Sequence, residues 1–151
     1  MGEVLDLGSK ITISIVQPED AGEAAKLSAE LGYPVSPDVL AERLAQLSTV
    51  DDHCVVGAYI QAQLVAWIDV GIVQHLQSGR YGEIGGLIVS KKYQGCGIGR
   101  ALIQRAEKWI ASHKVENVLV RSQIAREGAH AFYLRQKFTH VKTSAVFTKS
   151  I

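Results

Sequence analysis

The chain has 151 residues, of which 47% are hydrophobic and 21% charged, and its formal net charge is +1 at pH 7. This length and composition are typical of one soluble globular domain with a buried core, and we expect residues 1–151 to form that domain. The near-neutral charge argues against a nucleic-acid partner, because nucleic-acid binders usually carry a basic face. No run of 18 apolar residues is present, so no membrane partner is expected either.

The cysteines and the N-terminus point to an intracellular setting. Cys54 and Cys96 have neither the spacing of metal ligands nor the number of a disulfide framework. The first residues include Glu3 and Asp6 and lack a basic segment followed by an apolar block, so no secretory signal is expected. We therefore predict a cytoplasmic protein without a bound metal.

In the first half of the chain, strand patterns flank two helical ones. Residues 11–16 alternate isoleucine with polar side chains, which is the period of a half-buried strand. Pro18 opens a helix that ends at Gly32, and a second helix begins after Ser36 and runs to about Leu47. Apolar strands joined by short turns are then predicted at residues 53–60, 64–73 and 81–89.

The second half predicts a helix, a strand, another helix and a last strand. From Ile98 to about His113, apolar residues recur every three or four positions on one helical face. A strand follows at residues 117–122, then a helix containing Tyr133, and a final strand starting at Phe138. This order predicts an α/β fold (α+β with a mixed sheet) in which most strands are antiparallel.

Residues Gln94 to Arg100 read Gln-Gly-Cys-Gly-Ile-Gly-Arg and lie between the strand at 81–89 and the next helix. The first N–H groups of a helix have no intrahelical partner, and the helix dipole adds partial positive charge there. Glycines let an anion approach such donors closely. The segment therefore predicts a phosphate-binding loop.

Two familiar phosphate loops fit poorly, and a tight turn without any ligand is the plain alternative. A Walker-type loop needs Lys and then Ser or Thr after its last glycine, but Arg100 and Ala101 follow Gly99. A Rossmann loop needs G-x-G-x-x-G and an acid at the end of the next strand. Here the glycine spacing is G-x-G-x-G, and Glu116 precedes the next strand.

A third pattern, Q/R-x-x-G-x-G/A, is filled by Gln94, Gly97 and Gly99. It resembles the coenzyme A pyrophosphate loop of the GNAT N-acetyltransferase superfamily. The resemblance runs from about Ile11 to the C-terminus. It includes residues 129–133 (Ala-His-Ala-Phe-Tyr), which are similar to the family's A-x-x-F/L-Y segment. It implies a GNAT fold with helices on both sheet faces and with the strand at 81–89 splayed from the strand at 117–122.

The resemblance also implies how acetyl-CoA binds as a co-substrate. Its pyrophosphate would lie against Gln94, Gly95, Cys96, Gly97, Ile98, Gly99 and Arg100. A β-bulge at Gly85-Gly86 would leave backbone groups of Leu87, Ile88 and Val89 available to the pantetheine amides. A covalent acyl-enzyme on Cys96 is disfavoured, because no His or Asp is placed by the sequence to orient it.

For catalysis, the resemblance implies direct transfer of the acetyl group, with Tyr133 as the general acid. Glu83 is the candidate general base, a water chain is the alternative, and Asp69 and His130 are lesser candidates. Two positions depart from the family. Arg126 stands where an asparagine often contacts pantetheine. Lys137 stands where a glycine often precedes phenylalanine, which predicts a positive φ at a lysine.

The acceptor is predicted only as a class, a primary amine of a small molecule or peptide. An acidic and aromatic rim that suits a cationic amine is formed by Tyr33, Pro34, Asp38, Asp51 and Asp52. A non-catalytic acyl-CoA-binding sensor is the alternative function. The oligomeric state is left open, with a homodimer among the options.

Overall fold

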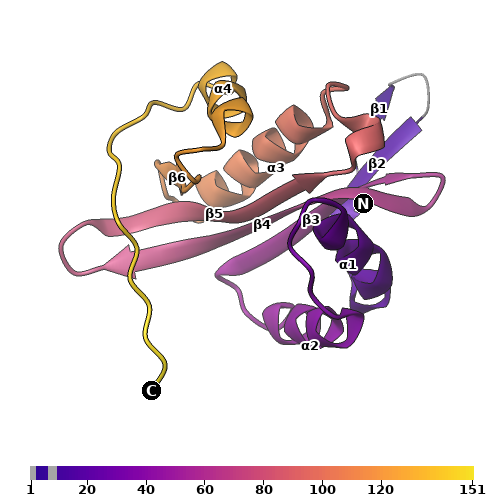
Figure 1. Ribbon diagram of the computed structural model, residues 1–151, viewed down its shortest axis with the longest axis horizontal. Coiled ribbons are helices and arrows are strands. Elements are labelled where there is room, and N and C mark those ends of the chain that lie inside the picture. The colour runs from indigo at the N-terminus through magenta and orange to yellow at the C-terminus, as the bar shows by residue number, and fades with distance from the viewer. Residues whose placement is uncertain (1–2, 7–9) are drawn as a thin grey trace. The chain divides into compact units, whose positions relative to one another are not determined.

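The computed structural model describes residues 3–6 and 10–151. The chain divides into two compact units, Met1–Val120 and Arg121–Ile151, and each is described by itself. The first unit contains β1 (Glu3–Asp6), β2 (Lys10–Ile15), α1 (Ala21–Glu30), α2 (Pro37–Leu47), β3 (His53–Ile60), β4 (Gln63–His75), β5 (Gly79–Val89), α3 (Ile98–Ser112) and β6 (Val118–Val120), with short 3-10 helices η1 (Pro18–Asp20) and η2 (Lys91–Tyr93) (Figure 1).

The strands of the first unit form one six-stranded sheet in the order β1-β2-β3-β4-β5-β6. Every neighbouring pair is antiparallel except β5 and β6, which are parallel. The predicted mixed, mostly antiparallel sheet is therefore confirmed. Strand β1 was not predicted from the sequence, and β6 is shorter than the predicted strand at residues 117–122.

Two layers of helix cover the sheet (Figure 1). On one face, α1 and α2 enclose a core cluster that includes Ala24, Leu27 and Leu44, and Trp67 of β4 packs against it. Helix α3 lies on the other face. The evidence is at Gly82 of β5, where a Cβ atom would meet the side chain of Ile110 on α3. Side chains along β4 and β5 therefore alternate between the face covered by α1 and α2 and the face covered by α3.

Local signals in the sequence explain where several elements begin and end. The Ser36 hydroxyl accepts a hydrogen bond from the Val39 N–H at 3.2 Å, and Pro37 occupies the first turn of α2. In β2, Ile11 and Ile13 are buried while Lys10 and Thr12 are exposed, as the alternating pattern predicts. The helix and strand types predicted between residues 11 and 135 are confirmed.

The hairpin between β3 and β4 is tighter than the gap of residues 61–63 between the two predicted strands. Ile60 pairs with Gln63, so the loop is the two residues Gln61 and Ala62. Their φ angles are +49° and +65°, the left-handed values of a type I′ turn. Asn and Gly are the usual residues at these two positions. Because this chain has Gln and Ala there, its sequence does not indicate the turn type.

The second unit contains α4 (Glu127–Arg135). Lys137 follows it with φ of +73°, which confirms the predicted positive φ. The predicted final strand from Phe138 is wrong, because residues 138–151 are described and form neither helix nor strand. A strand needs a partner for its N–H and C=O groups, and no other strand occurs among residues 121–151.

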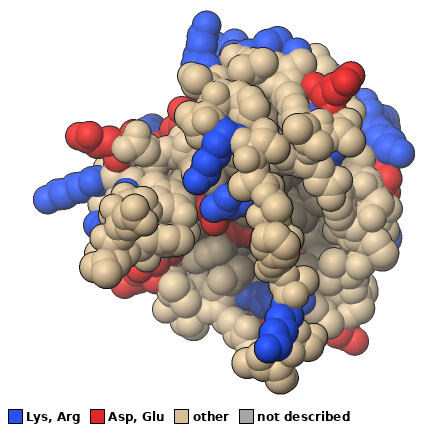
Figure 2. All heavy atoms as spheres, turned by 60° about the vertical axis from the view of Figure 1, so that its left-hand side comes forward, with Lys and Arg blue, Asp and Glu red and all other residues tan. Residues whose placement is uncertain are grey.

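Among the described residues, none of the helices has the length and apolar character needed to cross a bilayer. Figure 2 shows Lys and Arg side chains interspersed with Asp and Glu side chains over one face of the molecule, in keeping with the net charge of +1.

Candidate functional site

The predicted phosphate loop connects β5 to α3 and is open at its glycines. Gly95 and Gly97 have φ angles of +78° and +87°, which side-chain-bearing residues rarely adopt. A Cβ atom at either position would meet no other atom within 4 Å. Solvent space therefore reaches the backbone of this loop, as the approach of a phosphate requires.

The start of α3 offers donors to that space. Gly97 is the N-cap residue, and no described side chain caps the helix. The first intrahelical bond runs from the Ala101 N–H to the Gly97 carbonyl at 3.1 Å. The N–H groups of Ile98, Gly99 and Arg100 consequently precede the helical hydrogen-bond ladder, where the helix dipole favours an anion.

The loop is held in place by neighbouring elements. The Gln94 amide Nε2 donates to the Val89 carbonyl at 3.1 Å, so this side chain closes the loop onto the end of β5. The Lys91 N–H donates to the Glu30 carboxylate at 2.7 Å, which ties η2 to α1. Ile98 is 1% exposed and anchors the first turn of α3 in the core. These hydrogen bonds and the buried Ile98 side chain therefore hold the glycine loop in position.

Basic residues flank the glycine loop in the sequence. A free cysteine lies within the loop. Lys91, Lys92 and Arg100 are exposed on either side of the glycines. Their charges add to the positive potential at the helix start. Cys96 is exposed and unpaired, and its sulfur lies 3.8 Å from the Gln94 carbonyl oxygen.

Strand β5 pairs with β6 over only part of its length. It pairs with β6 at three positions, from Gly82 to Ile84. Beyond Ile84, no strand among the described residues lies along that side of β5, although β4 pairs with it as far as Val89. The segment Leu87–Val89 therefore has no strand partner on that side among the described residues, and it is the segment for which the family resemblance implies the pantetheine contact.

A β-bulge adjoins this segment. The register between β4 and β5 shifts between Asp69 and Val70, so that Gly85 is the extra residue. Glu83 lies two residues earlier and pairs with Gly71. Since Gly82 faces α3, the neighbouring Glu83 side chain projects from the opposite face, the one covered by α1 and α2. Its role as general base stays a prediction.

Tyr133 belongs to the second unit. It lies on α4, half-buried, with its ring against Phe132 at 5.3 Å and Phe138 at 5.6 Å between centroids. Burial raises the pKa of its hydroxyl above the usual value, and the charge of Arg126 lowers that pKa in part. Its hydroxyl therefore keeps its proton at neutral pH. The lesser candidate His130 donates from Nε2 to the Gln123 carbonyl at 2.9 Å.

His53 lies beside Asp69, although no pattern in the sequence points to it. His53 on β3 is hydrogen-bonded through Nε2 to Oδ1 of Asp69 on β4. That hydrogen bond raises the pKa of His53, burial opposes the rise, and the negative charge of Asp69 adds to it. Asp69 itself is conspicuous in the sequence as a carboxylate within an apolar strand, but nothing local points to its partner 16 residues away.

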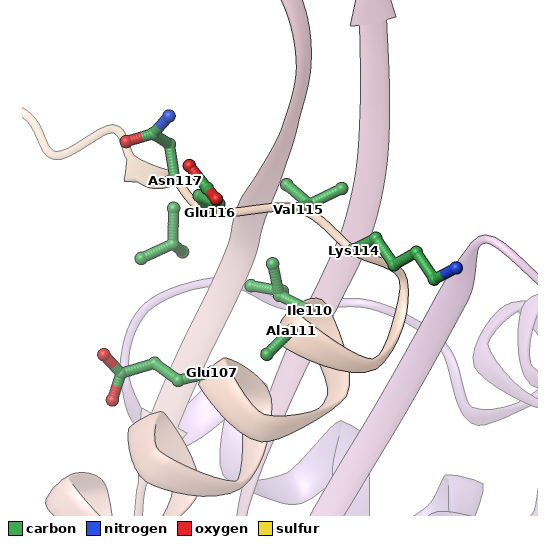
Figure 3. Close-up of a pocket in the computed structure, with 8 residues that line it drawn as sticks. Glu107, Ile110, Ala111, Lys114, Val115, Glu116 and Asn117 are labelled. Carbon is green, nitrogen blue, oxygen red and sulfur yellow. The ribbon is translucent and has the colours of Figure 1, made fainter.

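A shallow hollow lies at the far end of α3 from the glycine loop. It is lined by residues from the last turns of α3 and from the segment that leads to β6. Figure 3 shows Glu107, Ile110 and Ala111 on the helix and Lys114 to Asn117 beyond it. Since α3 starts at Ile98 and ends at Ser112, this hollow is separate from the predicted phosphate loop.

Comparison with known proteins decides the family. The profile of the acetyltransferase (GNAT) family matches residues 23–138. The chain belongs to this family. The match includes both the glycine loop and Tyr133. No curated protein sequence matches this GNAT protein significantly.

Solved structures show that it shares its fold with GNAT enzymes. Aminoglycoside 6'-N-acetyltransferase AAC(6')-Ih from Acinetobacter baumannii has a TM-score of 0.82 at 20% identity, covering 93% of this chain and 99% of that chain. Aminoglycoside N-acetyltransferase AAC(6')-Iy, solved with CoA, gives 0.84 at 14% identity, covering 95% and 97%. Glucosamine-6-phosphate N-acetyltransferase from Arabidopsis thaliana gives 0.75 at 17% identity, covering 91% and 99%.

Proposed function

We propose that this GNAT protein transfers the acetyl group of acetyl-CoA directly to a primary amine of a small molecule or peptide. The observation that carries the proposal is the loop before α3. Its glycines Gly95 and Gly97 leave open space in front of the uncapped N–H groups of the helix. Membership of the acetyltransferase family supports the reading of that space as a coenzyme A pyrophosphate site.

In the proposed complex the pyrophosphate accepts hydrogen bonds from the backbone of Gly95 to Arg100, including the first N–H groups of α3. Lys91, Lys92 and Arg100 supply positive charge around it. The pantetheine amides pair with the backbone of β5 at Leu87, Ile88 and Val89, as an added strand would. This pairing directs the thioester toward the bulge at Gly85 and toward Glu83.

The chemistry requires one nitrogen–carbon bond to form and one carbon–sulfur bond to break. The neutral amine attacks the thioester carbonyl, and the thiolate of coenzyme A leaves. The Tyr133 hydroxyl gives its proton to the developing thiolate, and the proton that the attacking nitrogen loses as the amide forms restores that hydroxyl. Its raised pKa keeps the phenol protonated at neutral pH, although it also makes the phenol a weaker acid. Glu83 removes the proton that an ammonium substrate must lose before it attacks.

The acceptor is proposed only as an amine. Two of the similar structures are aminoglycoside acetyltransferases and one acts on glucosamine 6-phosphate, so amino sugars belong in any test panel. Polyamines, amino acids and lysine peptides complete it. Release of free thiol with any of these amines supports the enzyme. Tight acetyl-CoA binding with no thiol release from the whole panel supports a sensor instead.

Calorimetry with acetyl-CoA tests the loop. We expect wild-type protein to bind and Gly97→Glu to lose binding, because the change adds bulk and negative charge where the phosphate lies. Gly97→Ala separates charge from backbone strain, since both variants share the unfavourable φ. Gly22→Glu is the matched control, because Gly22 is exposed on α1 with no atom within 4 Å of its Cβ position. Unchanged affinity in a folded Gly97→Glu protein would refute the assignment.

A further inference from the structure

Three glycines leave part of the sheet without side chains on the face covered by α1 and α2. Gly71 lies on β4, and Gly85 and Gly86 lie at the bulge in β5. A Cβ atom at each of them would meet a side chain of that face: His53 Nδ1 at 3.0 Å, Asp69 Oδ2 at 2.8 Å and Trp67 at 3.2 Å, respectively. We call these three residues the glycine patch.

Glu83 borders the same patch. In the sheet register, His53 of β3 pairs with Gly71 of β4, and Gly71 pairs with Glu83 of β5. The three residues form one row across the sheet, with side chains only at its two ends. Two strand spacings put about 10 Å between the Cα atoms of His53 and Glu83. Both side chains project from one face, and the position between them, Gly71, carries no side chain.

The orientation of His53 suits a proton acceptor. Its Nε2 is engaged by Oδ1 of Asp69, and its other nitrogen, Nδ1, lies toward the Gly71 position. A proton on Nε2 leaves the lone pair of Nδ1 directed at the glycine patch. The side chains of His53 and Asp69 are 26% and 32% exposed, so solvent reaches them.

We propose that His53, held by Asp69, accepts across the glycine patch the proton that Glu83 takes from the acceptor amine. This inference rests on the proposed acetyl transfer and adds a proton route to it. An ammonium substrate loses two protons on its way to the amide. One reaches the thiolate through Tyr133, and the other passes from the amine to Glu83 and on to His53. The imidazolium then releases it to solvent, so that the reaction yields amide, free thiol and one proton.

Asp69 gives the relay its electrostatic basis. Charged residues on the elements packed against β3 include Lys10 on β2, Asp38, Glu42 and Arg43 on α2, Arg105 on α3 and Asp69 on β4, with Asp51 and Asp52 just before β3 and Arg80 and Glu83 one strand further on β5. Asp69 supplies both of the contributions that raise the pKa of His53. A carboxylate that stabilises the imidazolium increases the affinity of His53 for the transferred proton.

Titration of the His53 ring by NMR tests the relay without any turnover. We expect the His53 pKa to lie above the ordinary value of about 6.5 and to fall in Asp69→Asn. It should also fall in Glu83→Gln, because that change removes a negative charge on the same face of the sheet. A His53 titration that is the same with and without Glu83 would overturn the relay, whereas a protein that binds no acetyl-CoA would overturn the proposed function instead.

The pH profile of kcat/KM, measured with an amine from the panel, gives the second readout. His53→Gln should lower kcat/KM about 10-fold or more at neutral pH and remove the acidic limb that His53 governs, with acetyl-CoA affinity unchanged. Asp69→Asn should move that limb to lower pH, and Asp69→Glu should restore part of it. His75→Gln, at the far end of β4, is the matched control and should change nothing. An unaltered profile in folded His53→Gln protein contradicts the proposal.

Discussion

The Tyr133 carbonyl accepts a hydrogen bond from the Phe138 N–H at 3.0 Å, and the two rings meet edge to face with centroids 5.6 Å apart. Between them, the Lys137 N–H donates to the Leu134 carbonyl at 3.1 Å, and Lys137 has φ of +73°. These two bonds and the apolar contact make up a Schellman motif, in which glycine usually occupies the left-handed position. The helix that carries Tyr133 therefore ends at a lysine with the left-handed backbone conformation that glycine usually adopts.

Lys137→Gly is therefore expected to be neutral or to raise the free energy of unfolding by up to about 1 kcal/mol. Glycine removes the steric strain of the left-handed lysine, although its extra freedom in the unfolded chain offsets part of the gain. Thermal or urea melts measure the change. Lys108→Gly is the control, because Lys108 is exposed inside α3 and should lose about 1 kcal/mol. A comparable loss at Lys137 would contradict the prediction.

The β3–β4 hairpin makes a second prediction about left-handed residues. Gln61 and Ala62 both have positive φ, where Asn and Gly are favoured. The double variant Gln61→Asn, Ala62→Gly should raise the unfolding free energy by about 1 kcal/mol, because it relieves strain at both positions. Chemical denaturation measures it. A lower midpoint in the double variant would show that the turn is not of type I′ in solution.

Tyr133→Phe should lower kcat by about 10² or more, the range expected when a general acid is lost. The affinity for acetyl-CoA should stay close to that of the wild type, since the phenol is proposed to act on the leaving thiolate and not on the bound phosphates. Single-turnover thiol release and calorimetry on the same preparation separate the two effects. Full activity in this variant would assign the acid to another residue.

The His53–Asp69 pair predicts how stability depends on pH. Asp69 raises the pKa of His53 in the folded protein, so the folded state binds protons more tightly than the unfolded chain does. The stabilisation is fully present below the unfolded pKa of about 6.5 and is lost as the pH rises through the folded value. His53→Gln should therefore cost more stability at about pH 5.5 than at about pH 8.5. Urea melts at both values check this, and an equal cost at both would contradict it.

The sequence alone determined the features that depend on neighbours along the chain. Amphipathic spacing fixed α3, Ser36 and Pro37 fixed the start of α2, and the glycines after β5 marked the loop before α3. These signals are local, because helix periodicity, capping and backbone freedom act over a few residues. The left-handed Lys137 was also predictable, since the helix had to end before Phe138.

Tertiary structure decided what depends on strand pairing. The register of β3, β4 and β5 places His53 beside Asp69 and in one row with Gly71 and Glu83, and the bulge at Gly85 sets which side chains share a face. A shift of one residue would send each side chain to the other face, and no local pattern specifies that choice. The predicted strand after Phe138 failed for the same physical reason, because a strand forms only where another supplies the partners of its backbone groups.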